Sequence, residues 1–179
     1  MSDTGLVVLL VVGVTISVAL KGTGFGRSEG AVQELGPLKV GGPAPDAALQ
    51  TMSGGELSLA LLRGRAVLLE FGATWCGPCR AMLRPMRDLQ ARNASRPPDV
   101  ISVDVGESVD VVRRHYATHK YGGIRIALDP TGAVSERYGV RAFPTLVVVD
   151  RGGIVRMINV GSIWNIEPVQ HVVEELAGP

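Results

Sequence analysis

Apolar runs and amphipathic stretches alternate along the chain after residue 48. AVLLEFG at 66–72 is a nearly continuous apolar run rich in β-forming residues, which predicts a strand covered on both faces. RAMLRPMRDLQAR, from residue 80, repeats apolar side chains at helical spacing. DVISVDV at 99–105 predicts the next strand. A strand, a helix and a strand at this spacing predict a right-handed parallel crossover.

The remaining pattern extends this unit in both directions. LQTMSGGELSL at 49–59 predicts a hairpin that precedes the crossover. After it we expect a helix over 107–121, a strand over 124–128, a short helix ending at 138, an antiparallel hairpin of 145–150 with 154–160, and a closing helix over 165–177. The chain therefore predicts an α/β fold over 42–179, with a central mixed sheet flanked by helices.

The N-terminal region differs from this domain in its composition. After a leader at 1–5, residues 6–20 form an uncharged apolar run, shorter than the roughly 20 residues of a usual membrane-spanning helix. We interpret it as an uncleaved transmembrane anchor, with a cleaved signal and then a buried helix as alternatives. Residues 21–41 are rich in glycine and predict a flexible linker. Lys21 and Arg27 follow the run, and a literal charge count would keep the domain in the cytoplasm.

Length, charge and cysteine content exclude several classes of protein. The chain has 179 residues and a formal net charge of +1, which provides no general electrostatic reason to bind nucleic acid. Its two cysteines, Cys76 and Cys79, cannot build a disulfide-rich scaffold, and a bridge between them closes too small a ring to stabilise much. The pair therefore indicates chemistry rather than structural support.

The sequence WCGPC places this pair where the predicted strand passes into the predicted helix. A cysteine in the first helical turn has its thiolate stabilised by unpaired backbone N–H groups and by the helix dipole. Cys76 is placed to attack a disulfide, and Cys79, one turn later, to attack the resulting mixed disulfide and release the product. Pro78 suits the first turn because its missing N–H costs nothing there. The pattern predicts a complete cycle of thiol-disulfide exchange.

Other polar residues carry weaker signals. A zinc site needs four ligands, and no second cysteine pair exists. His115 and His119 are spaced i, i+4, and we expect them to be solvated on the helix over 107–121, away from the cysteines, so no metal is predicted. Arg80, Arg84 and Arg87 repeat along one helix face, which we interpret as a solvated face, although Arg80 is close enough to Cys79 to bias thiolate formation.

Glu70 is an isolated acid in an otherwise apolar strand, six residues before Cys76. Burial of a carboxylate is costly and raises its pKa. We interpret Glu70 as the group that accepts or supplies a proton when Cys79 attacks. The alternative is that strand alternation directs it to a polar edge or to an arginine.

Phe143-Pro144-Thr145 begins the strand at 145–150. A proline at this place can simply mark an edge strand, but an X-Pro bond is also the common route to a cis peptide. Beside Cys76, such a segment could hold an extended client peptide by strand-like pairing.

With WCGPC, the preceding strand and the later FPT in place, the chain resembles the thioredoxin superfamily. More narrowly, GGPAPDAALQTMSGGELSLALLRGRAVLLEFGATWCGPCR and ALDPTGAVSERYGVRAFPTLVVVDRGGIV resemble the membrane-anchored TlpA/ResA-like thiol-disulfide oxidoreductases. The resemblance implies a thioredoxin-like fold in which Cys76 is the exposed nucleophile, Cys79 the resolving thiol and Pro144 a cis-proline facing them. Glu70 falls on the buried-acid position of thioredoxins. The client contacts would come from Trp75, Gly77, Pro78, Phe143, Pro144 and Thr145.

The resemblance also implies partners and a location. It implies a domain outside the cytoplasmic membrane, tethered by 6–20, that keeps the thiols of client proteins reduced, apocytochrome c among them. A membrane or thioredoxin-type electron donor would recharge it, with no cofactor beyond the cysteine pair. Two positions differ from the family pattern. Met82 stands where ResA-like proteins carry an acid, and Pro85 lies one residue later than the usual helix proline.

Two alternatives come from other functional classes. A peroxiredoxin-type peroxidase needs P-x-x-x-T-x-x-C, whereas this chain has Leu69 and Ala73 at the proline and threonine positions. A membrane-tethered thioredoxin-like binding module or chaperone would use the Pro144 groove without redox turnover. Client binding that survives loss of Cys76 would favour this second alternative.

Overall fold

The computed structural model describes residues 36–93, 95–119, 121–163 and 165–177. The predicted anchor at 6–20 lies outside them. None of the helices in these ranges combines the length and the apolarity that crossing a membrane requires.

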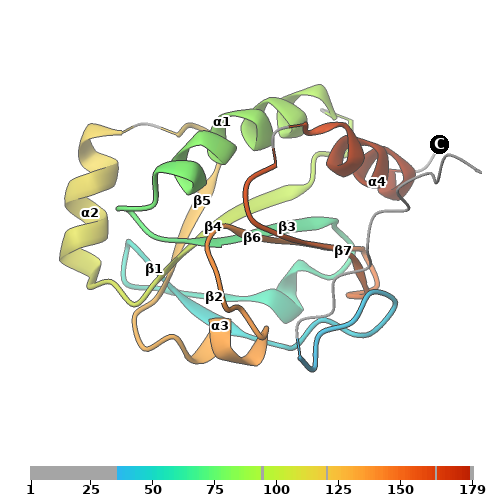
Figure 1. The fold of residues 1–179 in the computed structure, drawn as a ribbon. Helices are drawn as coiled ribbons and strands as arrows, with labels where there is room; N and C mark the ends of the chain where they lie inside the picture. The colour runs from blue at the N-terminus through green and yellow to red at the C-terminus, as the bar shows by residue number, and fades with distance from the viewer. Residues whose placement is uncertain (1–35, 94, 120, 164, 178–179) are drawn as a thin grey trace, which may run out of the picture. The chain divides into compact units, whose positions relative to one another are not determined.

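The elements, in chain order and as Figure 1 labels them, are β1 (Ala48–Thr51), β2 (Glu56–Ser58), a 3-10 turn η1 (Leu59–Leu62), β3 (Val67–Gly72), α1 (Gly77–Arg92), β4 (Asp99–Val105), α2 (Val109–Thr118), β5 (Arg125–Asp129), α3 (Ala133–Arg137), β6 (Thr145–Val149), β7 (Val155–Val160) and α4 (Glu167–Ala177).

The seven strands form one mixed sheet in the order β2-β1-β5-β4-β3-β6-β7. The central strands β3, β4 and β5 are parallel, and β1, β2, β6 and β7 pair antiparallel to their neighbours. The predicted α/β fold with a central mixed sheet is therefore confirmed. β3 is an internal strand that lies between β4 and β6. The WCGPC segment follows the carboxyl end of this strand.

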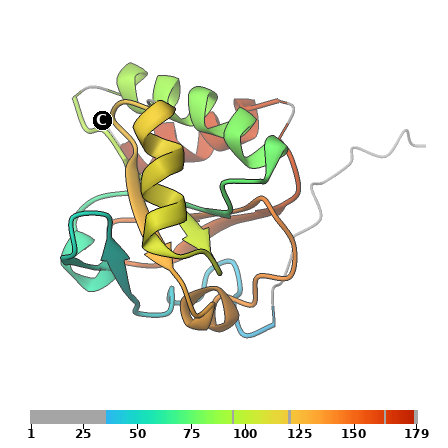
Figure 2. The same ribbon diagram turned by 90° about the vertical axis from the view of Figure 1, so that its left-hand side faces the viewer.

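Strand alternation divides the interior into two apolar layers. Leu68 on β3 packs with Met86 on α1 and Val169 on α4, whereas Phe71 on β3 packs on the opposite face with Tyr138, just after α3. The Phe71 and Tyr138 ring centroids are 5.2 Å apart. Figure 1 shows α1 and α4 above the sheet and α3 below it, and Figure 2 shows α2 beside α1 in front of the strands. Glu70 lies on the α1 face, because it alternates with Phe71.

Two boundaries differ from the sequence prediction. Leu38, inside the predicted linker at 21–41, is only 1% exposed and belongs to the core, and Gly41 N donates to Val155 O at 2.8 Å. Packing against the sheet therefore begins before residue 42. The helix predicted over 107–121 is shorter, because the backbone is extended at Ser108 and at His119.

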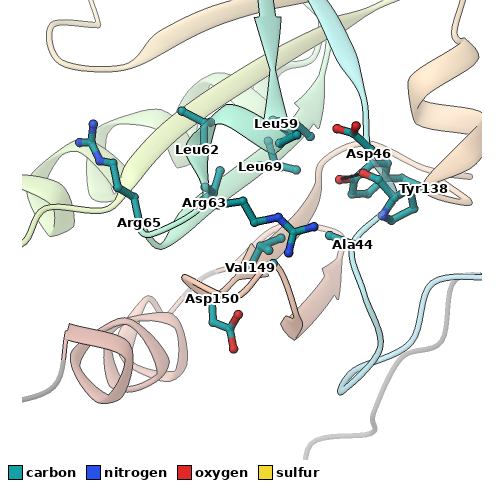
Figure 3. Close-up of a pocket in the computed structure, with 14 residues that line it drawn as sticks. Ala44, Asp46, Leu59, Leu62, Arg63, Arg65, Leu69, Tyr138, Val149 and Asp150 are labelled. Carbon is teal, nitrogen blue, oxygen red and sulfur yellow. Dashed lines mark hydrogen bonds between the residues drawn. The ribbon is translucent and has the colours of Figure 1, made fainter.

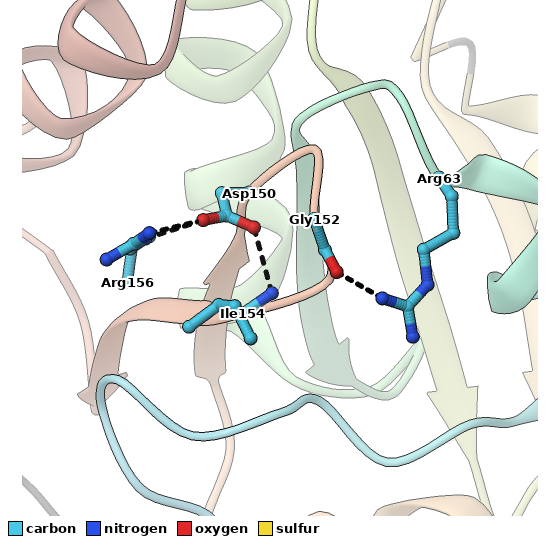
Figure 4. A network of polar contacts seen from close by, with 5 residues as sticks. All are labelled: Arg63, Asp150, Gly152, Ile154 and Arg156. Atoms are coloured by element: carbon cyan, nitrogen blue, oxygen red, sulfur yellow. Dashed lines mark hydrogen bonds and ion pairs between the residues drawn. The ribbon is translucent and has the colours of Figure 1, made fainter.

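The β6–β7 turn is held by polar contacts at one end of the sheet (Figure 4). Asp150 Oδ1 accepts from Ile154 N at 2.9 Å, and Asp150 Oδ2 pairs with Arg156 Nη2 at 2.6 Å. Arg63 Nη1 donates to the Gly152 carbonyl. These contacts fasten the segment that follows η1 to the hairpin predicted at Arg151-Gly152-Gly153.

A small cavity lies on the face of the sheet opposite α1 (Figure 3). Its volume is about 30 Å³, and Leu59, Leu69, Tyr138 and Val149 contribute to its lining. Such a volume holds water and not a substrate. It is also on the other side of β3 from Glu70, so it takes no part in the site described next.

Candidate active site

The two cysteines lie where the chain passes from β3 into α1, as predicted. Cys76 is the N-cap of α1 and its Sγ accepts a hydrogen bond from Cys79 N at 3.2 Å. Pro78 occupies the first turn. In this structure Cys76 and Cys79 form a disulfide, with their Cα atoms 5.3 Å apart. When the disulfide is reduced, the N–H groups and dipole of α1 stabilise a thiolate on Cys76.

Both cysteines are buried, with Cys76 5% exposed and Cys79 3%, so the exposed position that the resemblance implied for Cys76 is not found. The two residues differ instead in what they border. Cys76 lines a groove of about 630 Å³ on the protein surface, and Cys79 is not among the residues that line it. Trp75, which is 70% exposed, and Phe143 both line this groove and contact each other, with their ring centroids 6.0 Å apart. The remaining lining residues are Gly77, Pro78, Val105, Ser135, Val140, Arg141 and Ala142. A substrate in the groove therefore meets Cys76 first.

The segment before β6 forms one wall of the groove. The Phe143–Pro144 peptide bond is cis, as the resemblance implied. Pro144 itself is buried, and its carbonyl accepts from Gly161 N at 2.8 Å. Thr145 is fully buried, and its hydroxyl donates to Ala142 O at 2.8 Å. The Thr145 side chain holds this wall together from inside, and the client contact expected at Thr145 stays a prediction.

Glu70 is buried beneath the cysteines. It is 1% exposed, and burial raises its pKa to about 8, against a smaller opposing effect of the hydrogen bond from Ser102. Ser102 Oγ donates to Glu70 Oε2 at 2.8 Å, while Oε1 is buried without a hydrogen-bond partner. The alternative placement at a polar edge or beside an arginine is wrong, because β3 is covered on both sides by other strands.

Gly72 shows how close the Glu70 carboxyl lies to Cys79. A Cβ atom at Gly72 would be 2.6 Å from Glu70 Oε1 and 2.9 Å from Cys79 Sγ. The unpartnered oxygen and the sulfur therefore border the same small space, which only a glycine leaves open. Oε1 is thus the Glu70 oxygen that lies on the side of Cys79.

This contact predicts the effect of Gly72→Ala. The added methyl group has to displace either the carboxyl or the sulfur, and we expect a loss of about 1–3 kcal/mol in the free energy of unfolding, together with slower reaction of Cys79. Chemical denaturation and the rate of mixed-disulfide release measure these effects. Gly122→Ala is the matched control, because a Cβ there has no atom within 4 Å. Equal behaviour of both variants would contradict the assignment.

The loop before Cys76 is held by residues that sequence reasoning missed. Glu107 accepts from Thr74 N and from Thr74 Oγ1, each at 2.6 Å. Arg80 Nη1 donates to the Thr74 carbonyl at 3.0 Å. The guanidinium of Arg80 therefore fixes the loop, rather than belonging only to a solvated face. No signal in the sequence links Thr74 to Glu107, because the contact depends on how β3 and β4 pair.

A second missed group is buried beside Glu70. Asp104 is 2% exposed, and burial raises its pKa to about 7, with Glu107 adding to the increase. Tyr116 lies near both Ser102 and Asp104, and its hydroxyl lowers the pKa of Asp104 by less than burial raises it. A signal was present in the sequence, because Ser102 and Asp104 are polar residues two apart in an apolar strand and therefore share a face.

The histidines differ from the expectation of two solvated side chains. His115 is half-buried, and its Nε2 atom is buried without a hydrogen-bond partner. Its ring stacks on His119 at a centroid distance of 4.3 Å. Burial lowers the pKa of His115, and the nearby charges of His119 and Arg80 lower it further. The described residues contain no cluster of three or more His, Cys, Asp or Glu side chains that could hold a metal ion.

Comparison with known proteins agrees with this geometry. The sequence model of the AhpC/TSA family matches residues 40–158, which include the cysteines, Glu70 and the cis-proline. The chain belongs to the AhpC/TSA family. Within this family, the peroxidatic threonine and proline of peroxiredoxins are replaced by Ala73 and Leu69, both of which are buried.

Its AhpC/TSA relatives include thioredoxin-like proteins. The thioredoxin-like protein YneN of Bacillus subtilis is 32% identical over 147 residues, covering 82% of each chain. The thiol-disulfide oxidoreductase ResA of Geobacillus thermodenitrificans is 31% identical over 136 residues, which are 75% of this chain and 77% of ResA. These comparisons and the fold make this AhpC/TSA member a thioredoxin-like oxidoreductase whose redox group is a cysteine pair.

A solved structure shows the same fold. The thiol:disulfide interchange protein DsbE of Chlorobium tepidum superposes with a TM-score of 0.68 at 30% sequence identity. The match covers 78% of this chain and 95% of that protein. The predicted thioredoxin-like fold is thereby confirmed for the domain.

Proposed function

We propose that this chain reduces disulfide bonds in client proteins, with Cys76 as nucleophile and Cys79 as resolving thiol. The observation that carries the proposal is the asymmetry of the pair: Cys76 lines the surface groove, and Cys79 Sγ faces the unpartnered oxygen of Glu70 across Gly72. A nucleophile needs access to its substrate, and a resolving thiol needs access to a base.

The cycle has two exchange steps. The Cys76 thiolate attacks a client disulfide, forming a Cys76–client bond and expelling the second client sulfur as a thiolate, which takes a proton from water. Cys79 then gives its proton to Glu70 and attacks Cys76 Sγ. The Cys76–Cys79 bond forms as the client bond breaks, and the client leaves reduced. With a pKa of about 8, Glu70 accepts this proton in its ionised form, whose share rises with pH, and in its protonated form it returns a proton when the disulfide is reduced again.

The groove fits an extended peptide with an apolar side chain. The paired rings of Trp75 and Phe143 present aromatic surface in the groove that Cys76 lines, and they provide binding area that tolerates different sequences. Gly77 and Pro78 also line the groove and add no side chain that would block it. Clients would thus be disulfide-containing segments that are exposed or unfolded.

The direction of exchange is tested by the midpoint potential of the Cys76/Cys79 pair. The full chain is equilibrated in dithiothreitol or glutathione buffers, and the fraction reduced is measured by thiol labelling. We expect a value near about −270 mV, the range of reducing thioredoxins. A value near about −120 mV would make the protein a disulfide donor and would overturn the proposal.

We also propose that residues 6–20 tether the domain outside the cytoplasmic membrane, where a membrane or thioredoxin-type donor recharges it. Support comes from the apolar run and from the resemblance to the TlpA/ResA-like proteins. Digestion of the domain by protease added to cells with a permeable outer layer and an intact cytoplasmic membrane would support this location. Protection until the membrane is lysed would assign a tethered cytoplasmic thioredoxin instead.

Apocytochrome c is a client class that the resemblance implies, and a role in cytochrome c maturation is the corresponding proposal. Met82, at the position where ResA-like proteins carry an acid, is 3% exposed and packs in the α1 layer. The acid next to Cys79 is instead Glu70, on β3. Reduction of apocytochrome c disulfides by the purified chain tests this role directly, and inertness toward them would restrict the proposal to other clients.

A further inference from the structure

One charged side chain lines the groove that Cys76 borders. Nine of the ten described residues that line the groove are uncharged, and the tenth is Arg141. Arg141 lies two residues before Phe143, on the wall that leads into the cis peptide at Pro144, and it is exposed. A charged side chain of a client in this groove therefore meets the Arg141 guanidinium and no other charge on the described lining.

The guanidinium of Arg141 has no partner within the described parts of the chain. Neither an ion pair nor a hydrogen bond engages its side chain there. Two arginines nearby in sequence or in space differ from it. Arg137 donates to the Asp46 carbonyl at 3.0 Å, and Arg80 donates to the Thr74 carbonyl at 3.0 Å. A structural contact explains Arg137 and Arg80 and leaves the charge of Arg141 unexplained.

The acids near the cysteines do not supply the missing partner. Glu107 accepts two hydrogen bonds from Thr74, and Glu70 is 1% exposed beneath the cysteines. Neither of them lines the groove. A charge on the wall of a largely apolar groove is screened less by water than a charge on open surface. The groove therefore favours a negative over a positive client side chain.

We propose that Arg141 selects client segments that carry Asp or Glu beside the reacting cysteine. The inference rests on the proposed function, because it concerns which disulfides Cys76 attacks. Neighbouring residues of an extended peptide are about 3.3 Å apart along the strand, so an acid next to the client cysteine enters the groove together with it. A guanidinium binds a carboxylate through two parallel hydrogen bonds. Arg141 thus determines specificity in the first exchange step.

Three blocked peptides that differ only in charge test this selection. Each is a disulfide-linked dimer of acetyl-Gly-X-Cys-X-Gly-amide, in which X is glutamate, glutamine or lysine. The reduced full chain, in an uncharged detergent, reduces the dimer, so that two peptide thiols are released as the Cys76–Cys79 disulfide forms. The second-order rate is measured from the released peptide thiol. Dividing it by the rate of the same dimer with mercaptoethanol removes the effect of X on the disulfide itself.

The corrected rates should rank the dimers by charge. We expect the glutamate dimer to react at least about threefold faster than the glutamine dimer, and the lysine dimer to react more slowly than both. Arg141→Gln should make the three corrected rates equal, and Arg141→Glu should reverse their order. The preference should also fade in about 1 M salt, where charges are screened beyond about 3 Å. A uniform change in the reactivity of Cys76 cancels, because the dimers are compared within each variant.

Arg92→Gln is the matched control. Arg92 is an exposed arginine at the opposite end of α1 from the cysteines, and its replacement removes the same charge away from the groove. This variant should keep the preference, and its loss there would assign the preference to net charge and overturn the inference. Equal corrected rates with the unaltered chain, or a preference that survives in Arg141→Gln, would also overturn it and leave the proposed function intact. Failure to reduce any of the dimers would overturn the proposed function itself.

Discussion

Replacing Cys76 by serine is expected to abolish disulfide reduction, whereas replacing Cys79 should trap the client on the protein. Cys76 lines the groove, and its loss removes the nucleophile of the first step. We expect the rate of insulin reduction to fall on the order of 10³-fold or more. The Cys79→Ser variant keeps Cys76 at the N-cap of α1 and forms a mixed disulfide that it cannot resolve.

The two variants are each other's control, because both remove one sulfur and the disulfide. Gel electrophoresis without reductant should show a client adduct with Cys79→Ser and none with Cys76→Ser. An adduct with Cys76→Ser alone would reverse the assigned roles. Client binding without exchange in either variant, together with no turnover by the unaltered chain, would favour a binding module or chaperone over an oxidoreductase.

Replacing Glu70 by glutamine is expected to stabilise the domain in a pH-dependent manner. Burial raises the pKa of Glu70 from 4.5 to about 8, so the folded protein holds a proton that the unfolded chain releases in this range. For an acid, a raised pKa in the folded state costs stability as the pH rises. The cost is absent below about pH 4.5, grows up to pH 8 and is constant above it. Each pKa unit corresponds to about 1.4 kcal/mol, so the full effect is several kcal/mol.

Denaturant unfolding of the oxidised protein at pH 4.5 and at pH 9 measures this effect. The variant should match the unaltered protein at the lower pH and exceed it by several kcal/mol at the higher pH. Glu56→Gln, at the exposed first position of strand β2, is the control and should change little at either pH. A stability difference that is the same at both pH values would show that Glu70 does not titrate as its burial requires.

The proposed proton transfer with Cys79 would explain why a costly carboxylate occupies β3. A glutamine at 70 would satisfy Ser102 and avoid the burial of an acid, yet it cannot take a proton from Cys79. On the proposed role of Glu70, the site gives up stability for proton transfer, which is common where titratable groups in active sites are buried.

Most elements and the cysteine pair could be predicted from local patterns. Apolar runs mark the central strands, helical spacing marks α1, and a glycine-containing turn marks the β6–β7 hairpin, because each pattern reflects contacts within a few residues of chain. The position of Cys76 at the start of α1 follows from the order of strand and helix. The pKa direction of Glu70 also follows, since a lone acid in an apolar strand is buried when that strand is central.

Tertiary structure decided which residues serve this chemistry. Ser102 meets Glu70 across 32 positions of sequence, and Glu107 meets Thr74 across 33, because both contacts depend on the register of β3 against β4. The Thr145 side chain is buried for a similar reason, because β6 pairs with β3 inside the sheet. Sequence by itself determined the reactive pair and its buried acid, through local periodicity. Only strand pairing and helix packing decided the partners of that acid, because residues far apart in the chain become neighbours when the sheet forms.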